Sequence, residues 1–596
     1  MIRRPLRPLA RIIAARAKGD DPDQGEAEAR LARARGKRVR ETQRAQVRLL
    51  MVAVILLGGF ATIGGRMVVL ATTKEPARVA FVDDNPILPN RADIVDRNGR
   101  LLATNIIAKS LYAQPPLMVD RAAAAEGLAR IFPDLDAAVL KRRFAAPAKF
   151  VWVRRKVSPE QAQAVYDMGE PGLLLGDRET RLYPNGNLAS HILGGAGFGR
   201  EGVNAAEVVG RSGVERWFDE ILRGGDTKNR PLVLSIDLTA QTITRSVLAR
   251  GIKLMNAKGG AAVLMDAQTG EIVTMVSLPD FDPNYLPSAP KSADPADSPF
   301  FNRAAQGVYE LGSTYKLFTA AIAMDQGLAT PSSLVDTKPL RWGRYPIREF
   351  QNKNFAPYLS LTNVMVKSSN IGTARLALEF GAETQKEFLG ELGLLTPTSL
   401  ELDSARVAKP LYPKKWSEIS TITISYGHGL SASPVHLAAA YASLLNGGLK
   451  VEPSLIKGGR TIEKTRVVSE EISDNLRTIL RKVVTEGTGS FADVEGYQVG
   501  GKTGTADKPK RTGGYYSDKV IANFAAVFPA SAPEYVLVVI LDEPEDVMLG
   551  KTRRSAGWTA APIAGEIIRR VAPVLGLRPL TGEAQPGQSR VTLASQ

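Results

Sequence analysis

An uncharged apolar stretch near the start of the chain constrains its topology more than any other feature. Residues 49–65 (LLMVAVILLGGFATIGG) carry no charge, and residues 67–71 extend the stretch beyond Arg66. This length is at the short end for a membrane-spanning helix, and an arginine at its end can reach the membrane interface with its charged group. We therefore expect a single transmembrane anchor at 49–71.

The charges on either side of this stretch predict its orientation. Segment 1–48 holds 14 Lys and Arg against 6 Asp and Glu. The net charge of this segment is therefore +8, half of the +16 of the whole chain. Segment 30–48 contains eight basic residues, whereas segment 66–85 contains three. Because cytoplasmic flanks are rich in Lys and Arg, we expect residues 1–48 to be a basic cytoplasmic tail, disordered or loosely helical. The rest of the chain would then lie outside the cytoplasm.

Three other interpretations of this region explain less. A cleaved signal peptide would need a basic region as long as the whole of segment 1–48, and no clear small-residue cleavage site ends it. A buried core helix would leave the asymmetry of the flanking charges unexplained. A basic arm can bind nucleic acid, but here an apolar stretch follows it directly. The sequence therefore predicts a single-pass protein of the inner, cytoplasmic membrane, with no nucleic-acid partner.

The composition excludes several kinds of site. The chain has 596 residues, enough for two or three domains, and it contains no cysteine. Disulfides, zinc–thiolate sites and cysteine catalysis are therefore excluded. Its three histidines are His191, His428 and His436, and no G-x-S-x-G sequence frames a serine near them. We expect His428 and His436 to be structural, and we expect neither a metal site nor a cofactor.

One short motif can supply an activated serine. In Ser313-Thr314-Tyr315-Lys316, a lysine stands three positions after a serine, so both side chains share one face of a helix. Apolar residues nearly surround the helix that follows, which predicts a buried helix. Burial makes the neutral amine of Lys316 more accessible, and such an amine can accept the proton of a serine hydroxyl.

Two further motifs follow in an informative order. Ser368-Ser369-Asn370 comes next after the Ser313 motif, and Lys502-Thr503-Gly504-Thr505 comes last, at a much greater separation. Each motif alone is weak, because the first could be an ordinary helix start and the last a plain turn. The ordered set of three is typical of penicillin-recognising acyl transferases. A glycine within a strand marks close approach of another backbone or a ligand, so Gly504 would leave room for a peptide substrate.

The periodicity of several segments predicts their secondary structure. We expect strands at 150–153, 232–236 and 261–265, and a helix that starts at Ser158. Two long apolar runs, 524–528 and 535–541, are joined by a Pro-Ala-Ser-Ala-Pro turn and predict an antiparallel hairpin. A last helix is expected at about 559–575, and a polar tail follows it.

With these motifs the chain resembles the class B penicillin-binding proteins, the membrane-anchored peptidoglycan D,D-transpeptidases. Segments 91–99, 181–184, 213–215 and 426–430 also resemble theirs, and the resemblance covers roughly residues 47–576. Leu311 stands where many members have proline, and Gly312 keeps that turn flexible. The resemblance implies an α+β fold, with an α/β pedestal domain at 72–230 and a transpeptidase domain at 231–578. The latter would hold an antiparallel sheet flanked by helices, and residues 579–596 would be disordered.

The resemblance also implies the catalytic roles. Ser313 would attack the carbonyl of the penultimate D-Ala in a stem peptide, and Lys316 would take its proton. Ser368 would pass a proton to the leaving D-Ala, and Lys502 would tune that transfer electrostatically. An amine of a neighbouring stem peptide would then take the acyl group and form a cross-link. A β-lactam would acylate the same serine and remain.

Substrate binding is implied in the same way. Asn370 would hold the substrate amide, and Thr503 and Thr505 would bind the terminal carboxylate, with Gly504 between them. The backbone N–H groups of Ser313 and Thr505 would stabilise the oxyanion.

Other functions share the same three motifs. A serine β-lactamase needs a deacylating glutamate, usually in an E-x-x-L-N frame. Four glutamates that lie between the second and third motifs do not have that frame: Glu379, Glu383, Glu387 and Glu391. A D,D-carboxypeptidase passes the acyl group to water, and the sequence does not exclude it. A non-enzymatic β-lactam receptor or scaffold would have degenerate motifs, whereas these are intact.

The biological role is suggested by resemblance alone. The pedestal segments and residues 501–508 resemble the division-specific, FtsI-type branch more than the elongation-specific branch, which remains the alternative. No glycosyltransferase region lies between the anchor and the transpeptidase domain. The expected partners are therefore a separate glycosyltransferase and the membrane proteins of the divisome.

Overall fold

The computed structural model describes residues 9–19, 21–72, 91–201, 206–224, 230–288, 290, 292, 294–403, 407–459, 465–510, 512–547 and 552–580. The chain forms two units, Met1–Asp83 and Asp84–Gln596, each of which is described by itself.

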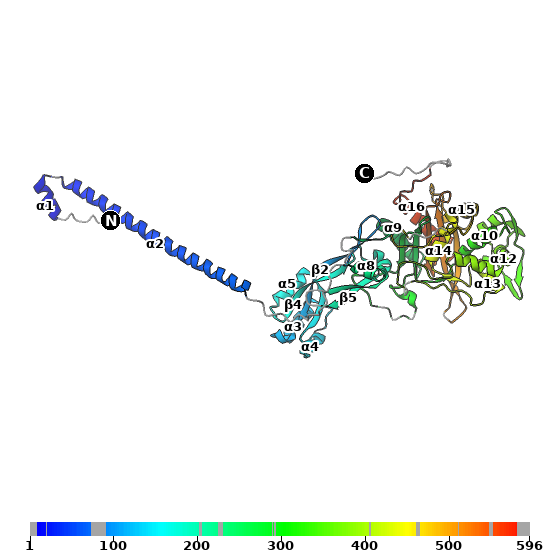
Figure 1. The fold of residues 1–596 in the computed structure, drawn as a ribbon, viewed down its shortest axis with the longest axis horizontal. Coiled ribbons are helices and arrows are strands. Elements are labelled where there is room, and N and C mark those ends of the chain that lie inside the picture. The colour runs from blue at the N-terminus through cyan, green and yellow to red at the C-terminus, as the bar shows by residue number, and fades with distance from the viewer. Residues whose placement is uncertain are drawn as a thin grey trace. The chain divides into compact units, whose positions relative to one another are not determined.

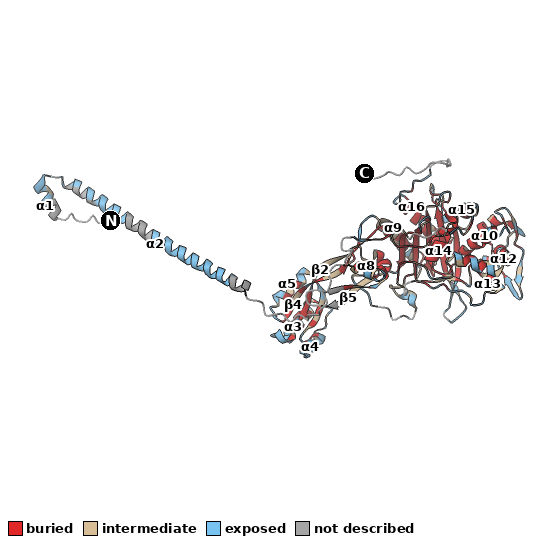
Figure 2. Cartoon of the chain, viewed as in Figure 1, coloured by how far each residue is buried: buried red, intermediate tan, exposed pale blue. Residues whose placement is uncertain are grey.

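The first unit is helical. It consists of α1 (Leu9–Lys18) and the long helix α2 (Pro22–Thr72) (Figure 1). Within α2, the segment Gln46–Met67 is long and apolar enough to cross a membrane, and its side chains are exposed (Figure 2). Because α1 covers Leu9–Lys18 and α2 begins at Pro22, most of the described part of the basic tail is helical, which is one of the two states expected for it. Its many Ala, Arg and Glu residues have high helix propensity, and proline suits the first turn.

The second unit begins with a small α/β domain. Strand β2 (Leu101–Ala113) pairs with β3 (Val151–Val157), β4 (Leu173–Leu182) and β1 (Ile94–Val95). Helices α3 (Arg121–Ile131), α4 (Ala137–Ala145) and α5 (Pro159–Asp167) share one hydrophobic core with β2 and β3. The Ser158 hydroxyl caps α5, as the sequence predicts. The remaining elements are α6 (Ser190–Leu193), β5 (Gly195–Glu201), β6 (Ala206–Ser212), α7 (Gly213–Trp217) and α8 (Asp219–Arg223).

A buried ionic cluster joins the three segments of this domain that resemble family motifs. Arg91 Nε lies 2.6 Å from Glu215 Oε2, and Arg181 Nε lies 2.7 Å from Glu215 Oε1. Arg91 also donates to Asp219 Oδ1 at 2.6 Å. Glu215 is fully buried, and a buried carboxylate is stable only when it is paired and hydrogen-bonded. Segments far apart in the sequence are therefore held together by their charges.

The C-terminal part of the second unit is built on a five-stranded antiparallel sheet. Its strand order is β16 (Gly500–Pro509), β17 (Tyr515–Phe528), β18 (Tyr535–Asp542), β8 (Gly259–Asp266) and β9 (Ile272–Leu278). Successive residues of each strand point to opposite faces, so the sheet separates two cores. Helices α10 (Lys316–Asp325) and α14 (Pro434–Leu445) share one core, and α9 (Leu238–Leu254) and α16 (Ala560–Val571) share the other (Figure 1). The α+β fold, the predicted hairpin and the last helix are confirmed.

The remaining elements surround this sheet. The helices are α11 (Leu361–Lys367), α12 (Asn370–Glu391), α13 (Glu418–Ser425) and α15 (Glu470–Thr485). Short strand pairs are β10 (Tyr309–Glu310) with β15 (Ser431–Ala432), β11 (Leu334–Asp336) with β14 (Tyr358–Ser360), and β12 (Leu340–Trp342) with β13 (Tyr345–Ile347).

The two domains of the second unit are joined through the chain around residue 232. The strand expected at 232–236 is shorter, β7 (Leu232–Val233), and it pairs in parallel with β1 of the N-terminal sheet. Leu234 then bridges to Ile456 of the C-terminal domain. At the other end of the chain, Leu580 N donates to Gly496 O at 2.8 Å. Most of the predicted tail, residues 581–596, lies outside the described residues.

Candidate active site

The serine of the first motif is held by close backbone packing. Ser313 lies in a 3-10 turn, Gly312–Tyr315, that leads directly into α10. Gly312 has φ +56°, and a Cβ there would lie 2.6 Å from the carbonyl oxygen of Thr505. A Cβ on Gly427 would lie 1.9 Å from the carbonyl oxygen of Gly312. Gly312 therefore allows the turn to lie against strand β16, which places Ser313 beside the third motif, and Gly427 allows the segment after residue 425 to lie against the same turn.

Lys316 is buried at the start of α10, as the apolar pattern predicts. Lys316 is 0 % exposed. Its ammonium donates to Asn370 Oδ1 at 2.7 Å, to Ser368 O at 2.5 Å and to Ser368 Oγ at 3.1 Å. Burial, with the nearby Lys502 ammonium, holds the pKa of Lys316 well below its ordinary value. Among the described residues, no hydrogen bond joins Lys316 to Ser313. Catalytic contacts are often long in a free enzyme and tighten when substrate binds.

Ser368 joins the second motif to the third. It ends α11 with φ +60°, a left-handed conformation that is unfavourable for a residue other than glycine. Its Oγ accepts a hydrogen bond from Lys502 Nζ at 2.9 Å as well as the one from Lys316. Lys502 is also 0 % exposed, and burial lowers its pKa to about 7. The hydroxyl of Ser368 therefore lies between two buried amines.

The third motif lies on β16, the edge strand of the sheet. Thr503 Oγ1 is 2.7 Å from Thr488 Oγ1, and Thr505 Oγ1 accepts from the backbone N of Ala556 at 3.0 Å. Gly504 is closely packed against another part of the chain. A Cβ there would lie 2.1 Å from the carbonyl oxygen of Leu311, so the backbone that approaches Gly504 belongs to this chain and not to a ligand.

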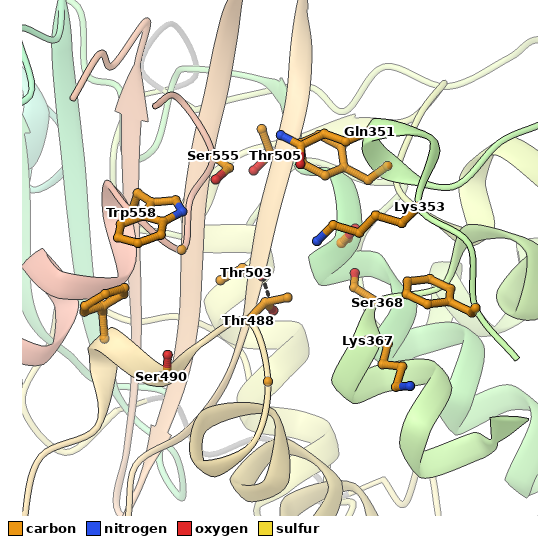
Figure 3. A pocket seen from close by; sticks show the side chains of 16 residues that line it. Gln351, Lys353, Lys367, Ser368, Thr488, Ser490, Thr503, Thr505, Ser555 and Trp558 are labelled. Atoms are coloured by element: carbon orange, nitrogen blue, oxygen red, sulfur yellow. Dashed lines mark hydrogen bonds between the residues drawn. The ribbon is translucent and has the colours of Figure 1, made fainter. Parts of the chain in front are cut away.

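These residues surround an open pocket of about 320 Å³ (Figure 3). Figure 3 shows Thr503, Thr505 and Trp558 on one wall and Lys353, Ser368 and Lys367 on the other. The full lining is Ser313, Phe350, Gln351, Lys353, Phe355, Lys367, Ser368, Gly487, Thr488, Ser490, Phe491, Thr503, Thr505, Ser555, Gly557 and Trp558. Lys316, Asn370 and Lys502 are not part of this lining; the two lysines contact Ser368, and Asn370 contacts Lys316.

Glu349 holds the second motif in place, and sequence reasoning missed it. The residue is 7 % exposed, and its carboxylate accepts from Ser369 Oγ at 2.5 Å, from Asn370 N at 2.6 Å and from Ile371 N at 3.3 Å. The last two donors belong to the first turn of α12, where a negative charge is favourable. No short motif surrounds Glu349, and it precedes the second motif by a loop and a helix, so no local signal could have identified it.

Asn370 is engaged on both ends of its side-chain amide. Its Oδ1 accepts from Lys316, and its Nδ2 donates to Arg348 O at 2.8 Å. An amide nitrogen carries two hydrogens, so one N–H remains for a ligand.

The histidines have structural contacts. His428 Nδ1 lies 3.1 Å from Glu310 Oε2, and His191 Nε2 lies 2.9 Å from Pro299 O. His436 completes a capping box with Ser433, and burial lowers the pKa of His436 to about 4, so it is neutral at pH 7. None of the three is among the described residues that line the pocket.

The chain matches known proteins over both domains of its second unit. Residues 260–569 match the penicillin-binding protein transpeptidase domain, and residues 86–245 match the penicillin-binding protein dimerisation domain. A probable peptidoglycan D,D-transpeptidase FtsI of Caulobacter vibrioides is 35% identical over 503 residues, which cover 82% of each chain. The peptidoglycan D,D-transpeptidase FtsI of Escherichia coli K12 is 30% identical, over 82% of this chain and 84% of its own length.

Solved structures agree with these matches. The crystal structure of penicillin-binding protein 3 from Mycobacterium tuberculosis, complexed with ampicillin, superposes with a TM-score of 0.62 at 26% identity. It covers 85% of this chain and 99% of its own. The resemblance drawn from the three motifs is therefore confirmed: the chain belongs to the penicillin-binding protein transpeptidase family, in its class B, FtsI-type branch.

Proposed function

We propose that this protein is a serine D,D-transpeptidase that cross-links peptidoglycan stem peptides during septal cell-wall synthesis and is acylated by β-lactams. One observation carries the proposal. The three motifs meet at Ser368 Oγ, which lies between the buried amines of Lys316 and Lys502 at the wall of the pocket that Ser313 also lines. Its relatives from Caulobacter vibrioides and Escherichia coli bear the name of the same reaction.

Acylation begins with the neutral amine of Lys316. Ser313 Oγ gives its proton to that amine and forms a bond to the carbonyl carbon of the penultimate D-Ala. The tetrahedral intermediate is stabilised by the backbone N–H groups of Ser313 and Thr505. When it collapses, the peptide bond to the terminal D-Ala breaks, and the leaving nitrogen takes a proton through Ser368. The short contacts of Ser368 with both lysines support this relay.

Substrate binding uses the two walls of the pocket. Thr503 and Thr505 bind the terminal carboxylate, and the remaining N–H of Asn370 holds the substrate amide. Gly504 lets β16 lie against the turn that carries Ser313. Gly504 therefore helps to position Ser313 beside the third motif. The extended backbone of an edge strand suits an extended peptide, because its outer hydrogen-bonding groups are available.

The acyl group is passed to an amine and not to water. Hydrolysis of the β-lactamase type needs a carboxylate that activates water beside the ester, and no Asp or Glu is among the described residues that line the pocket. Glu379, Glu383, Glu387 and Glu391 all lie on α12. Glu349 is closer, but it is buried and already accepts three hydrogen bonds. This arrangement supports a long-lived acyl-enzyme that waits for an acceptor stem peptide.

The proposed organisation follows the division of the chain. Residues 1–48 form a cytoplasmic tail, 49–71 the anchor, 72–230 the pedestal, 231–578 the transpeptidase domain and 579–596 a tail. The helix Gln46–Met67 fits a single-pass anchor. The catalytic domain then faces the periplasm. A separate glycosyltransferase makes the glycan strand, and membrane proteins of the divisome recruit the protein to the septum.

The reaction is tested with the full-length protein and nascent peptidoglycan that carries pentapeptides. We expect cross-linked muropeptides and release of D-Ala, and we expect both to be lost in Ser313→Ala. Ser490→Ala is the matched control, because Ser490 lines the same pocket without belonging to a motif. Release of D-Ala without cross-links, with tetrapeptides as product, would instead make the protein a carboxypeptidase.

A further inference from the structure

The active-site pocket has a strongly uneven charge. Of the described residues that line it, the only charged ones are Lys353 and Lys367, and neither Asp nor Glu is among them. Figure 3 shows the Lys353 side chain extending from its loop into the pocket. The Lys367 ammonium lies 5.9 Å from the ring centroid of Phe355. The pocket therefore favours an anionic ligand.

The Lys353 ammonium is not paired with any other group in the part of the chain that the structure describes. No hydrogen bond or ion pair of its ammonium to a described residue is present, although many other exposed lysines of this protein are paired. Lys141 with Glu126 and Lys109 with Asp177 are examples, both at 2.6 Å. An unpaired ammonium that extends into a ligand pocket is available to bind a ligand anion.

The loop that carries Lys353 is held in an unfavourable conformation. Gln351 and Asn352 have φ values of +57° and +54°, and neither is glycine. Such residues cost free energy and persist where the surroundings enforce them, most often at ligand sites. Two residues before Gln351, the buried Glu349 accepts hydrogen bonds from Ser369 and from the start of α12. The loop that carries Lys353 is thus connected to the second motif through Glu349.

Lys353 and the threonines of the third motif face the pocket from opposite walls (Figure 3). The terminal carboxylate of a stem peptide is expected at Thr503 and Thr505. A carboxylate at Lys353 would therefore be a different one, from a residue nearer the N-terminus of the peptide. In a peptide that ends in D-Ala-D-Ala, the first side chain that can carry it belongs to the residue before that dipeptide.

We propose that Lys353 forms a second anion subsite, with Lys367 adding to its positive potential, and that it binds a free side-chain carboxylate on the donor residue preceding D-Ala-D-Ala. The inference rests on the proposed function of Ser313 and adds the class of donor. A diamino diacid at that position pairs with Lys353. A donor peptide with lysine at that position would place its ammonium against the Lys353 ammonium. A donor with an amidated diacid would lack the negative charge that Lys353 binds.

Two penicillins that differ by one carboxylate test this subsite. Benzylpenicillin has only the ring carboxylate, whereas carbenicillin carries a second one on its acyl side chain, where the residue preceding D-Ala-D-Ala would lie. Second-order acylation rate constants are measured for both with the wild-type protein, Lys353→Gln and Lys353→Glu. Lys386→Gln, an exposed lysine of α12 outside the pocket, is the matched control.

We expect the ratio of the carbenicillin rate to the benzylpenicillin rate to fall about fivefold in Lys353→Gln, in the range of a single charge-assisted contact, and further in Lys353→Glu. Benzylpenicillin acylation should stay within about twofold, which also shows that the variants fold. Lys386→Gln should leave the ratio unchanged. A ratio that is the same in the wild type and both Lys353 variants would overturn the subsite. Acylation that persists in Ser313→Ala would instead contradict the proposed function, so the two failures are distinguishable.

Discussion

Lys502 Nζ lies 2.9 Å from Ser368 Oγ, and this contact connects the edge strand of the sheet to the end of helix α11. The same oxygen is 3.1 Å from Lys316 Nζ. A hydroxyl has one hydrogen and two lone pairs, so it can accept from a charged lysine while donating to a neutral one. The arrangement thus offers a path for a proton between the base that activates Ser313 and the leaving group.

The two lysines predict a bell-shaped pH dependence of acylation. Lys316 acts as a neutral amine, so the rate rises with pH as Lys316 loses its proton, at a pKa well below the ordinary value. Lys502 acts as a cation, and burial lowers the pKa of Lys502 to about 7, so the rate falls as pH rises through that value. The second-order rate constant for benzylpenicillin, measured from about pH 5 to about pH 9, tests both limbs.

Lys502→Arg is the matched variant for the falling limb, because arginine stays protonated. We expect its acylation rate to remain level above pH 7. A wild-type rate that continues to rise through the alkaline range, with no fall, would contradict the role given to the Lys502 charge.

Lys316→Arg tests the general base. Arginine keeps its proton, so it can fill the space but cannot accept hydrogen from Ser313. We expect the acylation rate to fall by about 10²–10⁴-fold, the usual effect of losing a positioned base. The rate is measured with fluorescent penicillin, and the fold is checked by thermal unfolding. Lys482→Arg on the exposed side of α15 should acylate normally. Near-normal acylation by Lys316→Arg would mean that another group takes the proton.

Glu349→Gln tests the residue that holds the second motif. Glutamine keeps the shape but places an NH₂ group against donors of Ser369 and α12, and it removes the charge. We expect stability to fall by about 1–3 kcal/mol, the cost of unsatisfied buried donors. Acylation should slow about tenfold through misplacement of Ser368, in its rate constant more than in the affinity for the penicillin. Full stability with unchanged acylation would show that the loop is positioned by other contacts.

Depletion of the protein in growing cells tests the septal role. If it supplies septal cross-links, we expect cells to elongate without dividing and a fluorescent fusion to gather at midcell. Rounded cells that still form septa, with a dispersed signal along the side wall, would favour the elongation-specific branch. Both branches use the same chemistry, so this outcome would leave the transpeptidase reaction unaffected.

Local patterns predicted much of the fold and of the site. The strands of the 524–541 hairpin and the buried helix after Ser313 follow from apolar periodicity. Each of the three motifs is a short continuous run of residues, so it can be found in the sequence. Non-local contacts could not be predicted in this way. The carbonyl that fills the space beside Gly504 belongs to Leu311, which lies in a distant part of the sequence. Glu349 likewise acts on a motif from a loop with no motif of its own.

Helix α2 is another element that could be predicted only in part from the sequence. Its apolar part was evident because a membrane span needs a continuous uncharged run, whereas the helical state of residues 22–48 depends on many small propensities. The pairing of β7 with the N-terminal sheet depends on which edge the chain meets, and so short a strand carries no pattern that specifies it.

Mapping the site of covalent modification tests the central claim most directly. The full-length protein is treated with benzylpenicillin, digested, and the modified peptide is identified by mass spectrometry. We predict one penicilloyl adduct, on Ser313, and no adduct in Ser313→Ala, while Ser490→Ala is modified like the wild type. An adduct on any other residue, or full labelling of Ser313→Ala, would contradict the assignment of Ser313 as the nucleophile.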